Sequence, residues 1–130
     1  SEVVRRIHLG LAGSGAIAAV MALRVLDEGD AATLEYCGIG NVRLVVSGDG
    51  RRDEGRPGMA GQPLPALRVQ RLRLVAPCLV AVFTDGLSGS LKLGPELDSI
   101  RLAHLPSLLL RRHGRRHDDA TCLVLRLGER

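Results

Sequence analysis

An aspartate stands where an apolar run ends, in the stretch "AVFTDGLSG" of residues 81–89. Five of the six residues at 79–84 are apolar, so Asp85 follows a segment that is typical of a buried strand. A buried charge is costly unless it is paired or bound to a cation, and Gly86 allows a tight turn at the strand end. The motif fits a cation ligand or an Asx turn, and an isolated Thr-Asp-Gly favours the turn.

A second acidic motif, formed by Asp118 and Asp119, precedes the apolar segment "CLVLRL". Adjacent carboxylates repel each other unless a cation or hydrogen bonds compensate. A solvated turn with Asp119 as an Asx cap explains the pair as well as a metal site does. If the two apolar strands are neighbours, Asp85 and Asp118 meet at one point, where carboxylate oxygens suit Mg²⁺ or Mn²⁺. We therefore expect these two residues to lie close together.

Length and composition limit the classes of protein to consider. The 130 residues suit one domain, and 45% hydrophobic with 25% charged residues indicate a soluble globular chain. No apolar run approaches the roughly 20 residues of a membrane span, and the N-terminus lacks the order of a signal peptide. Cys37, Cys78 and Cys122 have no metal-binding spacing and read as core residues. We expect a cytoplasmic protein without a membrane partner.

The net positive charge raises the question whether the chain binds nucleic acid. The net charge of +4 is almost all arginine, because Lys92 is the only lysine. The arginines look dispersed along the chain, and one Tyr and one Phe offer little for base stacking. Nucleic-acid binding is therefore a minor hypothesis, and we expect no nucleic-acid partner.

The first half of the chain predicts a helix and then strands. Apolar residues at helical spacing predict a helix over residues 1–11, capped by Ser1. Residues 16–26 are ambiguous, since their composition favours helix and their flanking glycines favour strand. Two short strands, "TLEYC" and "VRLVV", with the turn signals around them indicate a β-meander. Residues 50–65 predict an exposed, mobile flap with at most an irregular strand and no core residue.

The second half predicts a core strand, helices and a last strand. "LRVQRLRLV" alternates in part, so one of its faces should meet solvent, whereas "CLVAVF" does not alternate and predicts a fully buried central strand. Residues 97–113 are helical in pattern, with Pro106 opening a second helix and Gly114 ending it. "DDATCLVLRL" predicts a turn that leads into a strand.

These motifs, taken in order, carry a resemblance to a known family. "TLEYCGIGNVRLVV", a Pro/Gly loop, "CLVAVFTDGLSG", a helix and "HDDATCLVLRL" resemble the C-terminal part of the PPM-type metal-dependent serine/threonine phosphatases. The similarity is to the bacterial branch of sporulation stage II protein E and the stressosome phosphatases, and it covers nearly the whole chain. It implies an α+β fold, an α-β-β-α sandwich of antiparallel sheets flanked by helices, in which residues 16–26 form a strand.

The resemblance also implies a site and a reaction. It assigns Asp85 and Asp118 to a two-metal centre that holds Mn²⁺ or Mg²⁺ and activates water, with Asp119 as a weaker metal ligand. The implied substrate is a regulatory protein that carries phosphoserine or phosphothreonine, such as an anti-sigma-factor antagonist or a stressosome component. The oligomeric state is left open.

The upstream metal-binding acids of that family have no match in this sequence. Their absence leaves the expected single domain, residues 1–130, N-terminally incomplete and its enzymatic activity uncertain. The alternative is a catalytically inactive PPM-like module that binds a protein partner. Of the histidines, His8, His104 and His113 read as surface or helix-end residues, and only His117, beside the acids, is a candidate for a role that remains open.

Overall fold

The computed structural model describes residues 1–64 and 66–128 of the chain, and it is an α+β protein. These described residues form two sheets of antiparallel strands and two α-helices, which confirms the predicted fold class. Its contacts divide the chain into two compact units. The first unit is Ser1–Val42 with Glu54–Leu74, and the second is Arg43–Asp53 with Val75–Arg130. The expectation of one domain stays a prediction.

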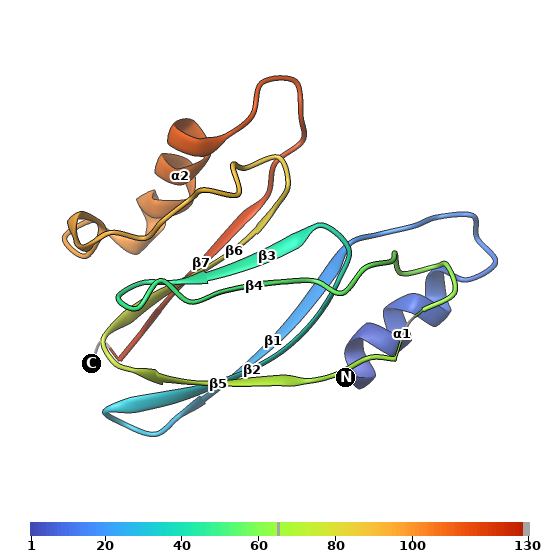
Figure 1. Cartoon of the computed structure of the whole chain (residues 1–130), viewed down its shortest axis with the longest axis horizontal. Coiled ribbons are helices and arrows are strands. Elements are labelled where there is room, and N and C mark those ends of the chain that lie inside the picture. Colours follow the sequence, from blue (N-terminus) through green and yellow to red (C-terminus); the bar gives the residue numbers. More distant parts are fainter. Residues whose placement is uncertain (65, 129–130) are drawn as a thin grey trace. The chain divides into compact units, whose positions relative to one another are not determined.

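The first unit combines a helix with a three-stranded sheet (Figure 1). Its helix is α1 (Glu2–Leu11), and its strands are β1 (Val20–Asp27), β2 (Ala31–Ile39) and β5 (Gln70–Val75), in the order β1-β2-β5. β1 and β2 form a long antiparallel hairpin that pairs Val20 with Ile39. Val4 of α1 packs with Cys37 and Ile39 of β2 in a small core, so the helix buries only a narrow apolar stripe.

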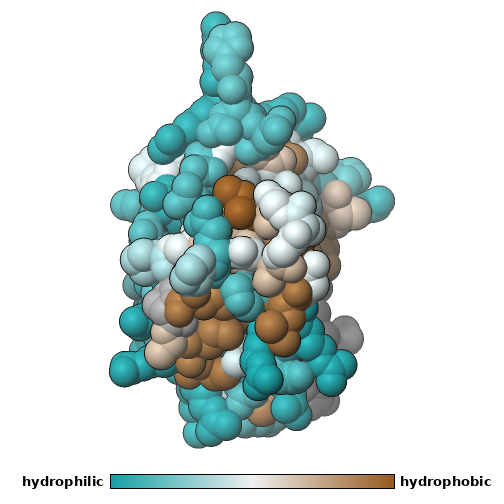
Figure 2. Space-filling view, turned by 90° about the vertical axis from the view of Figure 1, so that its right-hand side faces the viewer, coloured by the Kyte–Doolittle hydropathy of each residue, from teal (hydrophilic) through white to brown (hydrophobic). Residues whose placement is uncertain are grey.

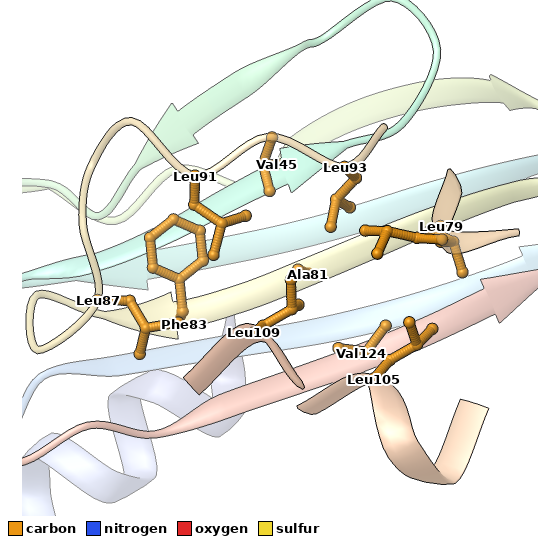
Figure 3. Close-up of a cluster of buried hydrophobic side chains, with 11 residues drawn as sticks. Val45, Leu79, Ala81, Phe83, Leu87, Leu91, Leu93, Leu105, Leu109 and Val124 are labelled. Carbon is orange, nitrogen blue, oxygen red and sulfur yellow. The ribbon is translucent and has the colours of Figure 1, made fainter. Parts of the chain in front are cut away.

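The second unit contains the larger core. Its four-stranded sheet has the order β4-β3-β6-β7, formed by β4 (Arg52–Glu54), β3 (Val42–Val46), β6 (Cys78–Thr84) and β7 (Cys122–Leu127). Two short 3₁₀ helices, η1 (Pro95–Leu97) and η2 (Leu102–His104), lead into α2 (Leu105–His113). Figure 3 shows how side chains from β3, β6, β7, α2 and the loop after β6 interdigitate. β6 lies inside the sheet and contributes Leu79, Ala81 and Phe83 to this cluster, and six of its seven residues are buried.

Most of the predicted elements are present. α1 follows Ser1, and residues 20–26 of the ambiguous segment lie in strand β1, so the flanking glycines were a better guide than the helix propensity. Pro106 stands in the first turn of α2 and Gly114 caps its end. "CLVAVF" is the buried strand β6, and β5 has the predicted exposed face. Within the described part of the chain, no helix is long and apolar enough to span a membrane.

The prediction of a β-meander was wrong, because the two strands of "TLEYCGIGNVRLVV" belong to different sheets. β2 pairs with β1 and β5, whereas β3 pairs with β4 and β6. The chain passes from one sheet to the other at Gly40, whose φ of +81° suits glycine. A Cβ atom at Gly40 would also stand only 2.9 Å from Cβ of Ala19. A tight backbone crossing therefore replaces the expected hairpin.

The predicted flap of residues 50–65 is tied to the first unit by backbone hydrogen bonds. Ala60 exchanges two of them with Ala18, at 3.1 and 2.9 Å, and Arg56 N–H donates to the Gly38 carbonyl at 2.8 Å. Ala60 is fully buried, so the expectation that this segment holds no core residue was wrong. The irregular strand is β4. His8 is not a plain surface residue either, since its Nδ1 accepts a hydrogen bond from Gly61 N–H at 3.1 Å.

Candidate functional site

The two acidic motifs lie side by side, at one end of the β6–β7 pair. Phe83 pairs with Cys122, and the next residues continue the ladder. The Thr84 N–H donates to the Thr121 carbonyl at 3.1 Å, and the Thr121 N–H donates to Oγ1 of Thr84 at 3.0 Å. This pairing brings the turn that contains Asp85 against the segment of Asp118 and Asp119, as the strand-end argument predicts.

The acids themselves differ in exposure. Asp85 is half-buried, whereas Asp118 and Asp119 are exposed, and His117 beside them is exposed with a φ of +69°. Among the described residues, no group of three or more His, Cys, Asp or Glu side chains is placed to hold a metal ion. A pair of hard cations needs more protein oxygens than this edge supplies. Binding of Mn²⁺ or Mg²⁺ by Asp85, Asp118 and Asp119 stays a prediction.

A basic segment that the sequence reasoning missed adjoins this edge. Arg111 and Arg112 lie in the last turn of α2, and Arg115 and Arg116 follow in the loop after Gly114; we call these four residues the arginine cluster. All four are exposed. The signal was present in the sequence as "RRHGRRH", and it contradicts the view that the arginines are dispersed.

Backbone hydrogen bonds hold the arginine cluster beside the Thr-Asp-Gly turn. The Arg115 N–H donates to the Gly86 carbonyl at 2.7 Å, and the Ser88 N–H donates to the His113 carbonyl at 2.8 Å. The Gly114 N–H closes the last turn of α2 on the Leu110 carbonyl at 2.9 Å. The backbone that carries the four side chains is therefore positioned by the core of the second unit.

The guanidinium groups of the cluster are unpaired in the described structure, although Asp118 and Asp119 follow Arg116 closely in the sequence. In the described ranges, none of its four guanidinium groups makes an ion pair or a side-chain hydrogen bond, whereas Arg6, Arg51, Arg71 and Arg73 are each paired with a carboxylate. Arg111 and Arg112 gain modest stabilisation from the negative end of the α2 dipole. Five N–H donors on each guanidinium remain available to an anionic ligand.

A separate hollow of about 710 Å³ lies in the second unit, between the turn after β3 and the chain before η1. Its apolar lining includes Val45, Val46 and Leu93, and its rim carries Lys92 and Asp98. Arg52 also lines the hollow, and its guanidinium donates hydrogen bonds to the carbonyl oxygens of Gly89 and Leu91. The hollow is large enough for a small molecule, but its balanced charges select no ligand class.

The cysteines lie in apolar surroundings, as predicted. Cys37 and Cys78 are buried, Cys122 is half-buried, and all three are free thiols. Burial raises the pKa of the Cys122 thiol to about 11. Burial, and secondarily the charge of Asp49, raises the pKa of the Cys78 thiol. Both shifts disfavour the reactive thiolate.

Comparison with solved structures gives one informative match. The fold is shared with a bacterial stressosome structure. That structure is described as "The bacterial stressosome: a modular system that has been adapted to control secondary messenger signaling", and the TM-score is 0.76 at 23% sequence identity. The match covers 95% of this chain and 65% of the other, so this chain spans somewhat less than two thirds of its length. No family model and no curated protein matches the chain.

These comparisons correct the assignment to the PPM-type phosphatases. The matching structure is described as part of a modular signalling system, not as a phosphatase, and no family model supports the resemblance. The missing metal cluster among the described residues agrees with this correction, because the implied reaction needs two well-coordinated cations. The phosphatase function and its inactive PPM-like alternative are both withdrawn.

Proposed function

We propose that this chain is a protein-binding module of a signalling assembly, and that its partner is a regulatory protein carrying phosphoserine or phosphothreonine. The observation that carries the proposal is the arginine cluster, residues 111–116, with four exposed guanidinium groups that have no partner among the described residues. The fold match to a structure described as a modular signalling system supports the assembly context.

The chemistry of the cluster suits a phosphorylated side chain. A phosphoserine carries about −1.5 to −2 charges at neutral pH and three strong acceptor oxygens. A guanidinium donates two parallel N–H bonds to such a group, which gives both energy and orientation. The backbone of Arg115 is held by its hydrogen bond to the Gly86 carbonyl, which lowers the entropy that this part of the loop loses on binding.

A nucleic acid is the competing anionic ligand, and the surroundings favour a protein. Non-specific binding of single strands combines positive charge with aromatic side chains on which bases stack. The chain has one Tyr and one Phe, and Phe83 is buried in the core of the second unit. The cluster thus supplies charge and hydrogen bonds without a stacking surface.

The test measures, by fluorescence anisotropy, how tightly the chain binds three labelled probes. These are a phosphoserine peptide, the same peptide without the phosphate, and a single-stranded oligonucleotide. We expect the phosphopeptide to bind best, and the variant Arg115→Gln/Arg116→Gln to weaken that binding by about tenfold or more, since a charge-assisted hydrogen bond contributes about 1.5–3 kcal/mol. The matched control, Arg5→Gln/Arg68→Gln, removes the same charge from exposed sites elsewhere and should change the affinity little. Equal affinity for the two peptides, or preference for the oligonucleotide, would contradict the proposal.

A further inference from the structure

The turn after β6 and the end of α2 form a short antiparallel pairing in the second unit. Leu87 and Gly114 are bridge partners. On one side of this bridge the Ser88 N–H donates to the His113 carbonyl at 2.8 Å, and on the other side the Arg115 N–H donates to the turn at 2.7 Å. Ser88 therefore lies opposite His113, one position away from the bridge.

This pairing decides which side chains share a face. Successive residues of a paired segment point to opposite faces, and directly opposite residues point to the same one. Leu87 is fully buried in the core of the second unit (Figure 3), so its neighbour Ser88 faces outward. His113 and Arg115, which flank Gly114, face outward with it. Opposite Cβ atoms lie about 4.5–5.5 Å apart and diagonal ones about 7–8 Å, so one small ligand can contact all three side chains.

Ser90 brings a second hydroxyl group to this face. Its Oγ lies 2.7 Å from Oγ of Ser88, and its N–H donates to Ser88 Oγ at 3.3 Å. Only one hydroxyl hydrogen can lie between the two oxygens, so the other is available to an acceptor. In the described ranges the half-buried His113 side chain makes no hydrogen bond, and its ring N–H is available as well. We call the residues that carry these hydrogen-bond donors the donor face: Ser88, Ser90, His113 and Arg115.

The surroundings place a negatively charged ligand at the Ser88 end of the pairing. The guanidinium of Arg43 lies against Gly89, because a Cβ atom there would stand 2.6 Å from its Nη1. The other end is less favourable to an anion, since the carbonyl oxygen of Asp119 lies against Gly86 and the acidic pair begins there. Hydroxyl, imidazole and guanidinium donors thus converge where the acids are absent.

We propose that the donor face holds the phosphate group of a phosphate monoester. The inference rests on the proposed function, because it assigns the phosphate of the bound phosphoserine or phosphothreonine to these residues. A phosphate monoester offers three strong acceptor oxygens, which suits a set of three kinds of donor. A carboxylate has two oxygens, and a phosphodiester has fewer free oxygens and less charge than the monoester. The donor face therefore favours the monoester over both.

The same residue types also occur in serine hydrolases, and the contacts here favour binding over attack. In those enzymes a carboxylate orients the imidazole, and the imidazole takes the proton of the serine hydroxyl. Within the described part of the chain, His113 has no carboxylate partner, and Ser88 Oγ is hydrogen-bonded to Ser90 instead. The hydroxyl groups are thus placed as donors to a ligand rather than as an activated nucleophile.

The donor face is tested by fluorescence anisotropy with the full chain and three labelled peptides. These carry phosphoserine, the methyl ester of that phosphoserine phosphate, or glutamate at the same position. We expect the phosphoserine peptide to bind about tenfold or more tightly than the other two, because the donors match a monoester. Ser88→Ala/Ser90→Ala and, separately, His113→Ala should each weaken its binding by about fivefold or more and reduce its advantage over the methyl ester.

Matched controls change the same residue types elsewhere in the second unit. Ser99→Ala and His104→Ala, at exposed residues, should bind all three peptides like the unaltered chain. If the phosphoserine peptide binds through the arginine cluster while the donor-face variants keep their affinity and their preference, the donor face is rejected and the proposed function stands. No binding of the phosphoserine peptide at all would reject both.

Amide chemical shifts test the donor face without a substitution that could loosen the turn. Saturation of the unaltered chain with the phosphoserine peptide should shift the amide resonances of residues 87–90 and 113–115 more than those of residues 99–104. Resonances of residues 87–90 that stay in place while the arginine cluster responds would put the phosphate elsewhere and overturn this inference alone.

Discussion

Gly86 lies directly against the backbone of Asp119. A Cβ atom at Gly86 would stand 2.2 Å from the carbonyl oxygen of Asp119 and 2.9 Å from Cα of Ala120. These partners are backbone atoms, which cannot swing aside as a flexible side chain can. The close approach explains why the turn after β6 needs glycine, and it joins the two acidic motifs that lie 33 residues apart in sequence (118 − 85).

Gly86→Ala should therefore destabilise the protein. The added methyl group forces the Thr-Asp-Gly turn away from the segment before β7, and overpacking of this kind costs about 1–3 kcal/mol. We expect a lower free energy of unfolding in urea, with the folded far-UV circular dichroism spectrum retained. Gly10→Ala is the control, because a Cβ atom at Gly10 in α1 would meet no atom within 4 Å and alanine favours helix. Equal stability of the two variants would show that the contact at Gly86 relaxes freely.

Arg52 and Arg51 are neighbours with different expected contributions to stability. The Arg52 guanidinium donates to two main-chain carbonyls, those of Gly89 and Leu91, and so joins β4 to the loop after β6. Arg51 makes an exposed ion pair with Asp49 at 2.8 Å. We expect Arg52→Gln to lower the free energy of unfolding by about 1–3 kcal/mol and Arg51→Gln by less than about 1 kcal/mol. A larger loss at Arg51, measured by urea denaturation, would reverse this ranking.

The fold was predictable where local patterns and burial agree. "CLVAVF" predicts a buried strand because its residues are apolar on both faces, and Pro106 with Gly114 marks α2 by backbone chemistry alone. The separation of β2 from β3 was not predictable in this way. It depends on partner strands far along the chain, and a glycine pair between two apolar runs looks the same in a hairpin and in a crossing between sheets.

The candidate site was predictable in part. Neighbouring apolar strands correctly predict that the segments of Asp85 and Asp118 meet. The arginine cluster was not predicted, because the arginines look dispersed along the chain. That these four lack an ion-pair partner among the described residues appears only in three dimensions. The family resemblance rested on the same strand pattern, which reports shared architecture better than shared chemistry.

Surface apolar residues on the first unit are another feature that sequence periodicity did not predict. The helical spacing of apolar residues correctly predicts α1, but of these residues Val3 is 57% and Ile7 38% exposed, whereas Val4 is fully buried. Figure 2 shows apolar side chains, in brown, among hydrophilic ones on one face of the surface. A small groove of about 210 Å³ at Val3 and Val69 is bordered by Arg24 and Glu35. Periodicity predicts the direction of a face, but the partner that covers it sets how wide the buried stripe is.

Stability should fall at alkaline pH because of the buried thiols. The pKa of Cys122 is raised by burial from 9.0 to about 11, so between these values the folded state binds more protons than the unfolded state. The contribution of the protonated thiol is complete below pH 9 and is lost as the pH rises through 11. Urea denaturation at a series of pH values should show this decline, and Cys122→Ala should reduce its slope. An identical slope in the variant would assign the decline to other groups.

Divalent metal should bind this chain only weakly. Asp85, Asp118 and Asp119 supply at most three carboxylates, two of them exposed, whereas Mn²⁺ and Mg²⁺ prefer near-octahedral coordination by several protein oxygens. Water can fill open positions but cannot supply the missing negative charge. Isothermal titration with Mn²⁺ should therefore give no saturable binding in the micromolar range, and excess Mn²⁺ should raise the melting temperature little, because ligand stabilisation follows concentration relative to the dissociation constant. Asp98→Asn, in the separate hollow, is the matched control for Asp85→Asn. Tight Mn²⁺ binding that Asp85→Asn abolishes and Asp98→Asn preserves would show that this edge of the sheet is a complete metal site after all.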